Sequence, residues 1–241
     1  MDTVAILVDG GFYTRRAKTL WGERDGKTSA EILHRYCMAH LFHPEGENYA
    51  RVRDRLYRIF YYDCPPMDRN VYHPYLKKDK PLKKEPLYSW MTEFQEELRS
   101  KRKVALRLGR LSENEIGYQL SIETIKKLCN GSTRFENLTE ADFHLNVRQK
   151  GVDMRIGIDI ASMAYKKQVT KMILIAGDSD FVPAAKLARR EGIDFVLNPM
   201  GNHINSDLNE HIDGIQRLQN FDPDRPKEDK KIQNKERNAE I

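Results

Sequence analysis

Two short apolar runs end in the same way, and they are the clearest pattern in the chain. Val4–Val8 is followed by Asp-Gly-Gly from Asp9, and Met172–Ala176 is followed by Gly-Asp-Ser-Asp from Gly177. Runs without a polar position are typical of strands that are buried on both faces of a sheet. A third strand, rich in aromatic residues, is predicted over Leu56–Asp63.

Helical patterns separate these strands. Apolar residues at steps of three and four predict helices over Phe12–Leu20, Ala30–Leu41 with Ser29 as N-cap, Leu87–Lys101, Ile122–Leu128, Val152–Ala164, from Phe181 onward, and over a last stretch carrying Leu208, Ile212, Ile215 and Leu218. Further strands are predicted at Val104–Gly109, at Phe143–Val147 as an edge strand, and at Ile193–Leu197. Strands that alternate with helices predict an α/β fold with a mostly parallel sheet covered on both faces.

Charge and proline content divide the chain further. We expect one domain over residues 1–221, with a less regular basic and aromatic insertion at about 65–142, and a charged, flexible tail at 222–241. Between Leu76 and Arg110 the chain carries eleven basic and five acidic residues, interleaved with aromatic side chains such as Tyr88 and Trp90. Basic and aromatic groups together suit single-stranded nucleic acid, through phosphate attraction and base stacking. The alternative is a solvated loop followed by a charged helix face.

The overall composition agrees with a cytoplasmic protein. The net charge of +5 permits a polyanionic partner, and no apolar run approaches the roughly 20 residues of a membrane span. The three cysteines, Cys37, Cys64 and Cys129, show no metal-binding spacing. We therefore expect reduced thiols, no zinc site and no membrane association.

Acids follow two of the strands and open one of the helices. Asp9, Asp178 and Asp180 follow strands, and Asp153 opens the helix from Val152. Carboxyl ends of parallel strands meet at one edge of a sheet, so these carboxylates are expected to converge there. Converging carboxylates repel one another unless a cation lies between them, and Mg²⁺ and Mn²⁺ prefer oxygen ligands. Metals held in this way support the hydrolysis of phosphodiesters.

Simpler interpretations exist for each acid. Asp is a favoured N-cap, so Asp9, Asp178 or Asp180 is also explained by the helix that follows it. Asp159 lies between two isoleucines, where a hydrogen bond or a polar stripe accounts for it. We interpret Asp63 as a turn aspartate before Pro65.

Three segments, taken in order, resemble the NYN domains of the PIN-like nuclease group. They are Val8-Asp9-Gly10-Gly11, Lys150-Gly151-Val152-Asp153 with Asp159, and Ala176-Gly177-Asp178-Ser179-Asp180-Phe181. The resemblance extends over roughly residues 1–221. It implies a Rossmann-like three-layer sandwich with an acidic Mg²⁺- or Mn²⁺-dependent site that acts on RNA.

The resemblance also assigns roles to residues. It implies Asp9, Asp153, Asp178 and Asp180 as catalytic metal ligands, with Asp159 either as a fifth ligand or as a support for the others. Candidates for substrate binding are Lys150, Ser179, Lys83, Lys84 and Arg107. The chain departs from the family pattern at Gly11 and Phe12, where many relatives carry a polar Asn.

These observations favour a metal-dependent ribonuclease, most simply an endoribonuclease acting on single-stranded RNA. An alternative is a weak or inactive module that binds RNA or a partner on the same fold, which the departure at Phe12 motivates. A phosphatase acting on small phosphoesters is a third hypothesis, since acidic sites on such sheets support different chemistries. Oligomeric state stays open, with a homo-oligomer as one alternative.

Overall fold

A parallel sheet of six strands forms the centre of this computed structural model, which describes residues 1–45 and 50–225. The strand order is β12-β11-β10-β1-β4-β7, and every neighbouring pair is parallel. The strands are β1 (Thr3–Asp9), β4 (Arg55–Asp63), β7 (Val104–Leu108), β10 (Lys171–Ile175), β11 (Asp194–Asn198) and β12 (Gly214–Ile215). The predicted parallel α/β sheet is therefore confirmed.

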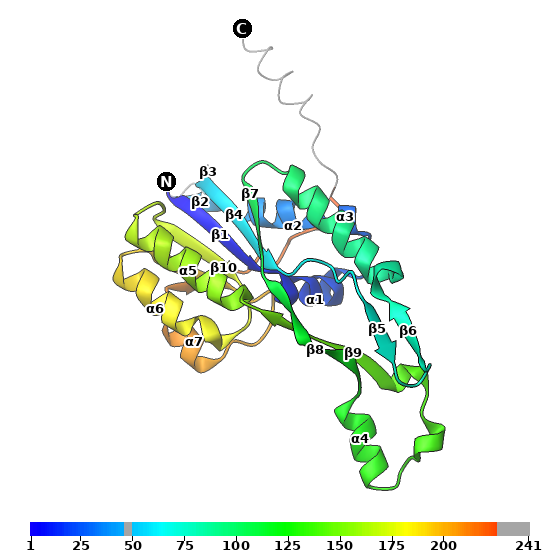
Figure 1. Ribbon diagram of the computed structural model, residues 1–241. Helices are drawn as coiled ribbons and strands as arrows, with labels where there is room; N and C mark the ends of the chain where they lie inside the picture. Colours follow the sequence, from blue (N-terminus) through cyan, green and yellow to red (C-terminus); the bar gives the residue numbers. More distant parts are fainter. Residues whose placement is uncertain (46–49, 226–241) are drawn as a thin grey trace.

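Helices cover both faces of the sheet (Figure 1). One layer contains α1 (Gly10–Trp21), α2 (Gly26–Ala39) and α3 (Pro86–Ser100), and the other contains α5 (Val152–Tyr165), α6 (Val182–Arg190) and the short α7 (Ser206–Glu210). Alternate residues of β1 serve the two layers: Val4, Ile6 and Val8 pack toward α1–α3, and Ala5 and Leu7 pack toward α5 and α6. Because both faces are covered, the buried stretches Val4–Val8 of β1 and Met172–Ile175 of β10 are apolar at every position.

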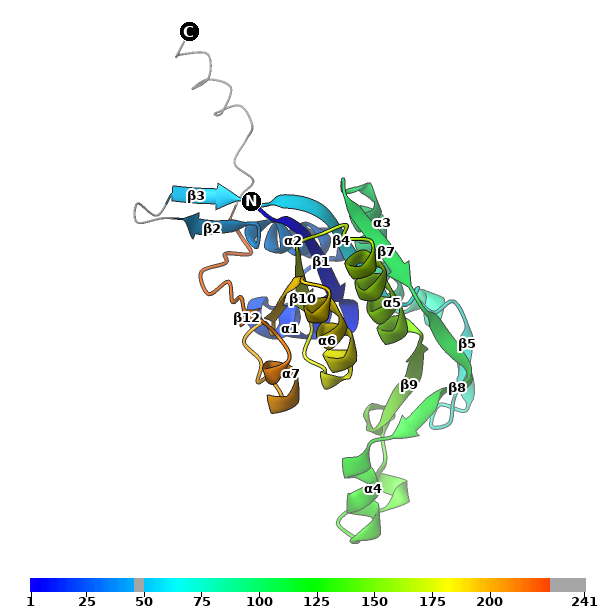
Figure 2. The same ribbon diagram turned by 90° about the vertical axis from the view of Figure 1, so that its left-hand side faces the viewer.

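An antiparallel arm extends from the sandwich (Figure 2). It consists of β8 (Arg110–Leu120) and β9 (Phe143–Lys150), which enclose α4 (Ile122–Cys129) and two short 3-10 turns, η2 (Phe135–Asn137) and η3 (Glu140–Asp142). The hairpin of β5 (Asn70–His73) and β6 (Lys78–Pro81), followed by η1 (Leu82–Lys84), packs on this arm. The ring centroids of His73 and Tyr118 are 4.1 Å apart at that contact. A further hairpin joins β2 (Phe42–Glu45) to β3 (Ala50–Arg53).

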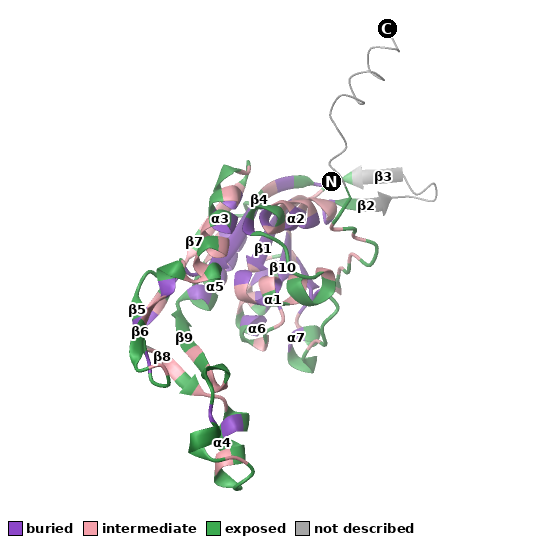
Figure 3. Cartoon of the chain, turned by 90° about the vertical axis from the view of Figure 1, so that its right-hand side faces the viewer, coloured by how far each residue is buried: buried purple, intermediate pink, exposed green. Residues whose placement is uncertain are grey.

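The predicted insertion at 65–142 divides between two parts of the molecule. Helix α3 and strand β7 belong to the sandwich, whereas the β5–β6 hairpin and the β8–β9 arm project from it. Much of the outer arm is exposed (Figure 3). Strand β8 escapes the sequence pattern because most of its described residues are only half-buried, and such a strand needs no strict alternation of apolar and polar residues.

Helix α2 begins earlier than predicted. Its N-cap is Asp25, whose Oδ1 accepts a hydrogen bond from the backbone nitrogen of Thr28 at 2.8 Å, so Ser29 lies inside the helix. Gly26 is needed there because α3 passes close by, and a Cβ atom on Gly26 would lie 2.9 Å from the Cβ atom of Glu93. The contact with α3 thus requires a glycine at the first residue of α2.

The last predicted helix is wrong in its second half. Helix α7 ends at Glu210, and the chain then forms β12, in which Gly214 pairs with Val196 and Ile215 with Leu197. The sheet offers β11 as an open edge there, and its backbone groups are satisfied by this short strand rather than by a further helical turn.

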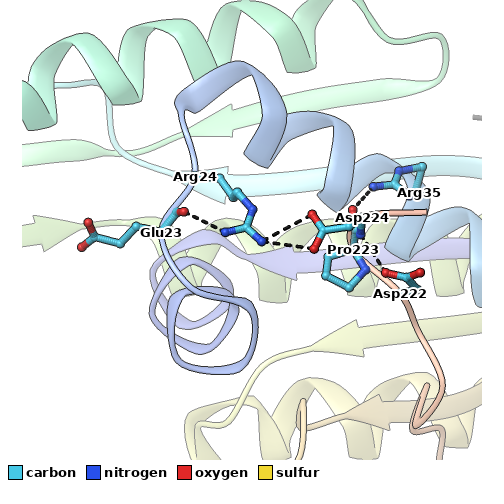
Figure 4. A network of polar contacts seen from close by, with 6 residues as sticks. All are labelled: Glu23, Arg24, Arg35, Asp222, Pro223 and Asp224. Atoms are coloured by element: carbon cyan, nitrogen blue, oxygen red, sulfur yellow. Dashed lines mark hydrogen bonds and ion pairs between the residues drawn. The ribbon is translucent and has the colours of Figure 1, made fainter. Parts of the chain in front are cut away.

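The end of the described chain returns across α1 and α2 (Figure 4). Asp224 forms an ion pair of 3.2 Å with Arg24, and Arg35 donates hydrogen bonds to the backbone oxygens of Pro223 and Arg225. The ring of Phe221 lies 5.3 Å from that of Trp21. The first residues of the predicted tail, 222–225, are therefore in contact with the domain, and residues 226–241 lie outside the described part. No helix in the described ranges has the length and apolar character to cross a bilayer.

Candidate metal centre

Strands β1 and β10 lie side by side at the topological switch point of the sheet. From β1 the chain continues to β4 and β7 on one side, whereas from β10 it continues to β11 and β12 on the other. Ligands of open α/β sheets bind at the carboxyl ends of the strands at such a point. Asp9 is the last residue of β1, and Asp178 follows β10 after two residues, so the two acids flank the switch point.

Asp9 both ends its strand and caps the helix that follows. Its Oδ1 accepts a hydrogen bond of 3.1 Å from the backbone nitrogen of Phe12. Burial raises the pKa of Asp9, the Phe12 hydrogen bond lowers it, and the neighbouring carboxylates of Asp153 and Asp63 raise it, against an opposing effect of Arg15. The N-cap interpretation is thus correct, but it does not exclude a second role, because other acids surround the same carboxylate.

The Gly-Asp-Ser-Asp segment forms η4 (Ser179–Phe181), a short 3-10 turn that leads into α6. The cap of this turn is Asp178, whose Oδ1 accepts a hydrogen bond of 3.1 Å from the backbone nitrogen of Asp180. Both carboxylates are exposed, and Ser179 is half-buried between them. Asp180, which lies in the first turn, is therefore not the capping residue.

The carboxylate of Asp153 interacts electrostatically with Asp9 at the end of β1 and with the acids that follow β10. It lies in the first turn of α5, after Gly151, whose φ of 77° lets the chain turn sharply out of β9. Partial burial raises the pKa of Asp153, and the carboxylates of Asp178 and Asp180 raise it further. Since Asp153 also raises the pKa of Asp9, the four predicted acids share one region of negative potential.

The carboxylate oxygens of these four acids suit a hard divalent cation, but the side chains do not form a closed cage. Among residues 1–45 and 50–225, no three acidic, histidine or cysteine side chains lie close enough to hold one ion. Mg²⁺ does not require such a cage, because it keeps several water ligands and is often held by one or two carboxylates. Asp9, Asp153, Asp178 and Asp180 are the residues that would hold it.

Asp63 lies near Asp9, which the turn interpretation did not predict. It ends β4, next to β1 in the sheet, and its carboxylate accepts hydrogen bonds from the Tyr61 hydroxyl at 2.8 Å, the Cys64 nitrogen at 2.7 Å and the Gln149 Nε2 at 3.1 Å. Burial raises the pKa of Asp63 in spite of these donors. The sequence did indicate this position, because Asp63 ends a predicted strand as Asp9 follows one. The prolines at 65 and 66 favoured a turn instead.

Asp159 and Arg107 form a pair of their own. Arg107 Nε lies 2.9 Å from Asp159 Oδ2, and the Tyr62 hydroxyl donates to the same oxygen at 2.9 Å. The Arg107 guanidinium also lies over the ring of Phe60. These partners show that Asp159 is hydrogen-bonded, which is one of the alternatives that the sequence left open. Arg107, a candidate for substrate binding, is therefore already paired with Asp159.

The remaining candidates for substrate binding lie on two surfaces. Lys150, at the end of β9, borders a cavity of about 870 Å³ that we call the basic cavity, together with Arg69, Arg110 and Arg155. Lys83 is instead paired with Asp68 at 2.7 Å, and Lys84 is exposed on η1. The basic cavity also includes Gly151 and Arg155, which lie two residues before and two residues after Asp153.

Comparison with known proteins adds the family. A protein of unknown function from Vibrio parahaemolyticus, known from its crystal structure, is 14% identical to this chain, and the alignment covers 91% of this chain and 94% of that one with a TM-score of 0.44. No curated protein matches the chain. The family model described as NYN domain matches residues 38–213, a range that contains Asp153, Asp178 and Asp180, whereas Asp9 precedes it. The chain therefore belongs to the NYN domain family and has the fold of PIN-like nucleases.

Proposed function

We propose that this protein is a Mg²⁺- or Mn²⁺-dependent ribonuclease that hydrolyses phosphodiester bonds of single-stranded RNA. The observation that carries the proposal is the mutual repulsion of the acids at the switch point. Burial raises the pKa of Asp153, and repulsion from Asp178 and Asp180 raises it further; burial also raises the pKa of Asp9, and repulsion from Asp153 adds to it. A divalent cation removes this repulsion, and membership of the NYN family supports a nuclease.

The residues divide into metal-binding and substrate-binding groups. Asp9 and Asp178 hold the main cation, Asp153 completes its protein ligands, and Asp180 binds a second cation or orients the attacking water. A metal bound in this way supplies a Lewis acid and lowers the pKa of its water. Lys150 and the other cations of the basic cavity attract the phosphates of the strand on the α5 side of the acids.

A cleavage assay with matched variants tests the proposal. Wild-type protein should cut a labelled, unstructured RNA in the presence of Mn²⁺ and stop when EDTA is added. Asp178→Asn should abolish cleavage while circular dichroism and thermal unfolding stay close to wild type, because Asp178 is exposed and Asn retains the capping oxygen.

The control is the same substitution at the opposite edge of the sheet. Asp194 begins β11 and pairs with Lys171 at 3.0 Å, far along the strand from the acids. Asp194→Asn should cleave like wild type. Equal rates for Asp178→Asn and wild type would remove the assigned role of Asp178.

One observation favours a second candidate, a module that binds RNA or a protein partner without cutting it. Phe12 is buried with 7% of its surface exposed, so this position, three residues after Asp9, offers no polar group to orient a water. Under this hypothesis the purified protein retains RNA on a filter or in a mobility shift, yields no products with either metal, and binds equally in EDTA.

A further inference from the structure

A second cavity lies on the side of the sheet that α1, α2 and α3 cover. Its volume is about 570 Å³, and it is enclosed by α1, the start of α2 and the first turns of α3. Trp21, Leu87, Trp90 and Met91 provide apolar walls, and we call this space the aromatic cavity. The chain contains only two tryptophans, and both line it.

The two indole rings are held in place by their own contacts. The ring of Trp90 stacks on Phe94 with centroids 5.0 Å apart, and its Nε1 donates a hydrogen bond of 2.8 Å to the backbone oxygen of Arg24. Trp21 packs at 5.3 Å from both Tyr36 and Phe221. Walls that are already ordered lose little conformational entropy when a flat ligand enters, and such rigid aromatic surfaces suit stacking.

The aromatic cavity reaches residues at the ends of β1 and β4. Gly11 and Asp63 both line it, and Gly11 lies two residues after Asp9. Arg15 lines the same cavity, and its guanidinium opposes the rise that burial causes in the pKa of Asp9. Within the described residues, Arg15 has neither an ion pair nor a side-chain hydrogen bond, so this cation is available for a phosphate.

Strand β9 separates the two cavities at the root of the arm. Gln149 lines the aromatic cavity and donates its Nε2 to Asp63, whereas the next residue, Lys150, lines the basic cavity. A cationic pocket and an apolar, aromatic pocket thus meet at the end of β9. An RNA strand carries the matching groups in succession, because its phosphates are negatively charged and its bases are flat.

We propose that the aromatic cavity binds one unpaired nucleobase of an RNA strand, with Arg15 holding the phosphate that leads from this base toward the acids. This subsite rests on the proposed function for its substrate class, but its occupancy requires no metal and no cleavage. Bases stack on aromatic side chains and on arginine when they are free of pairing, so duplex RNA is excluded.

Tryptophan fluorescence in EDTA tests the subsite directly. A short, unstructured oligouridylate should quench the emission of the wild-type protein in a saturable way. In a variant with Trp21→Phe the emission comes from Trp90 alone, and it should still be quenched in a saturable way. Inorganic polyphosphate and a blunt RNA duplex, which offer charge without a free base, should leave the emission unchanged.

A pair of neighbouring substitutions tests the location. Leu87 and Ser89 both lie in the first turns of α3, where an acid is compatible with the helix, but only Leu87 lines the cavity. Leu87→Glu should weaken the apparent affinity for oligouridylate about tenfold, as expected for the loss of one stacked base. Ser89→Glu adds the same charge outside the cavity and should change the affinity less than about twofold.

The outcomes separate this inference from the proposed function. Saturable quenching in EDTA without any cleavage in Mn²⁺ supports the subsite and removes the nuclease. Cleavage in Mn²⁺ without quenching, or equal effects of Leu87→Glu and Ser89→Glu, overturns the subsite and leaves the nuclease. Quenching by uridine monophosphate as tight as by the oligomer assigns the cavity to a free nucleotide and overturns the RNA subsite.

Discussion

The ring of Phe12 lies directly against the backbone of Gly177. A methyl group on Gly177 would come 2.9 Å from Cδ2 of Phe12 and closer still to Cε2. This contact joins the two strand ends that carry Asp9 and Asp178, because Phe12 follows β1 and Gly177 follows β10. It also gives a physical reason for an apolar residue where many relatives carry Asn, since Phe12 packs across the switch point.

Gly177→Ala should destabilise the protein by about 1–3 kcal/mol, the usual cost of overpacking a filled site. The added methyl group has to displace either the Phe12 ring or the turn that carries Asp178. The urea midpoint of unfolding measures the loss. Gly157→Ala is the control, because no atom lies within 4 Å of a Cβ atom there, and alanine inside α5 should be neutral or stabilising by up to about 1 kcal/mol.

The double variant Phe12→Leu with Gly177→Ala isolates the contact itself. Its loss of stability should be smaller than the sum of the two single losses, by at least about 0.5 kcal/mol, because the smaller side chain makes room for the methyl group. Strict additivity would mean that the two residues do not interact.

Asp63 should matter through its hydrogen bonds rather than through its charge. Asp63→Ala leaves the donors of Tyr61, Cys64 and Gln149 without their acceptor and should cost about 1–3 kcal/mol. Asp63→Asn should cost less, because the amide oxygen still accepts from Cys64 and the amide nitrogen can donate to the Tyr61 hydroxyl. Chemical denaturation in EDTA compares the two, and an alanine variant as stable as wild type contradicts the assignment.

Lys150 should contribute one phosphate contact to RNA binding. Lys150→Gln should therefore reduce the slope of log affinity against log salt by about 0.7, the value for one neutralised phosphate on a single strand. Lys166→Gln removes the same charge at the other end of α5 and should leave the slope unchanged. Binding is measured by fluorescence anisotropy over a series of salt concentrations, and identical slopes for the two variants would exclude Lys150.

His40 should make the fold sensitive to acid. Burial lowers its pKa from 6.5 to about 4, so between these values the unfolded chain binds a proton that the folded chain does not. Stability should thus fall as the pH drops from about 6.5 to about 4, by roughly 3 kcal/mol from this group. Below that range both states are protonated, so the difference in proton binding disappears and the loss of stability no longer changes with pH.

The difference between two pH profiles isolates this effect from those of the acids. His40→Gln keeps an acceptor toward Asn198, to which the His40 Nε2 atom lies 2.6 Å away, but it does not titrate. Its urea midpoint should depend less on pH than that of wild type over this range. His203→Asn, an exposed substitution, should follow the wild-type profile.

The local sequence was sufficient for the central strands and the acids behind them. A parallel strand buried on both faces has to be apolar at every position, so β1 and β10 are visible as uninterrupted runs. An acid directly after such a run lies at the carboxyl edge whatever the strand order is. Asp9 and Asp178 could therefore be proposed without a structure, as could Asp153 at the start of its helix.

Tertiary structure alone decided which neighbours these acids have. The strand order puts β1 beside both β10 and β4, and only that order brings Asp63 next to Asp9. Arg107 pairs with Asp159 from a strand far away in the chain, and the aromatic cavity combines Trp21 with Trp90 from separate helices. Such contacts depend on strand register and helix packing between distant segments, which the periodicity within one segment does not encode.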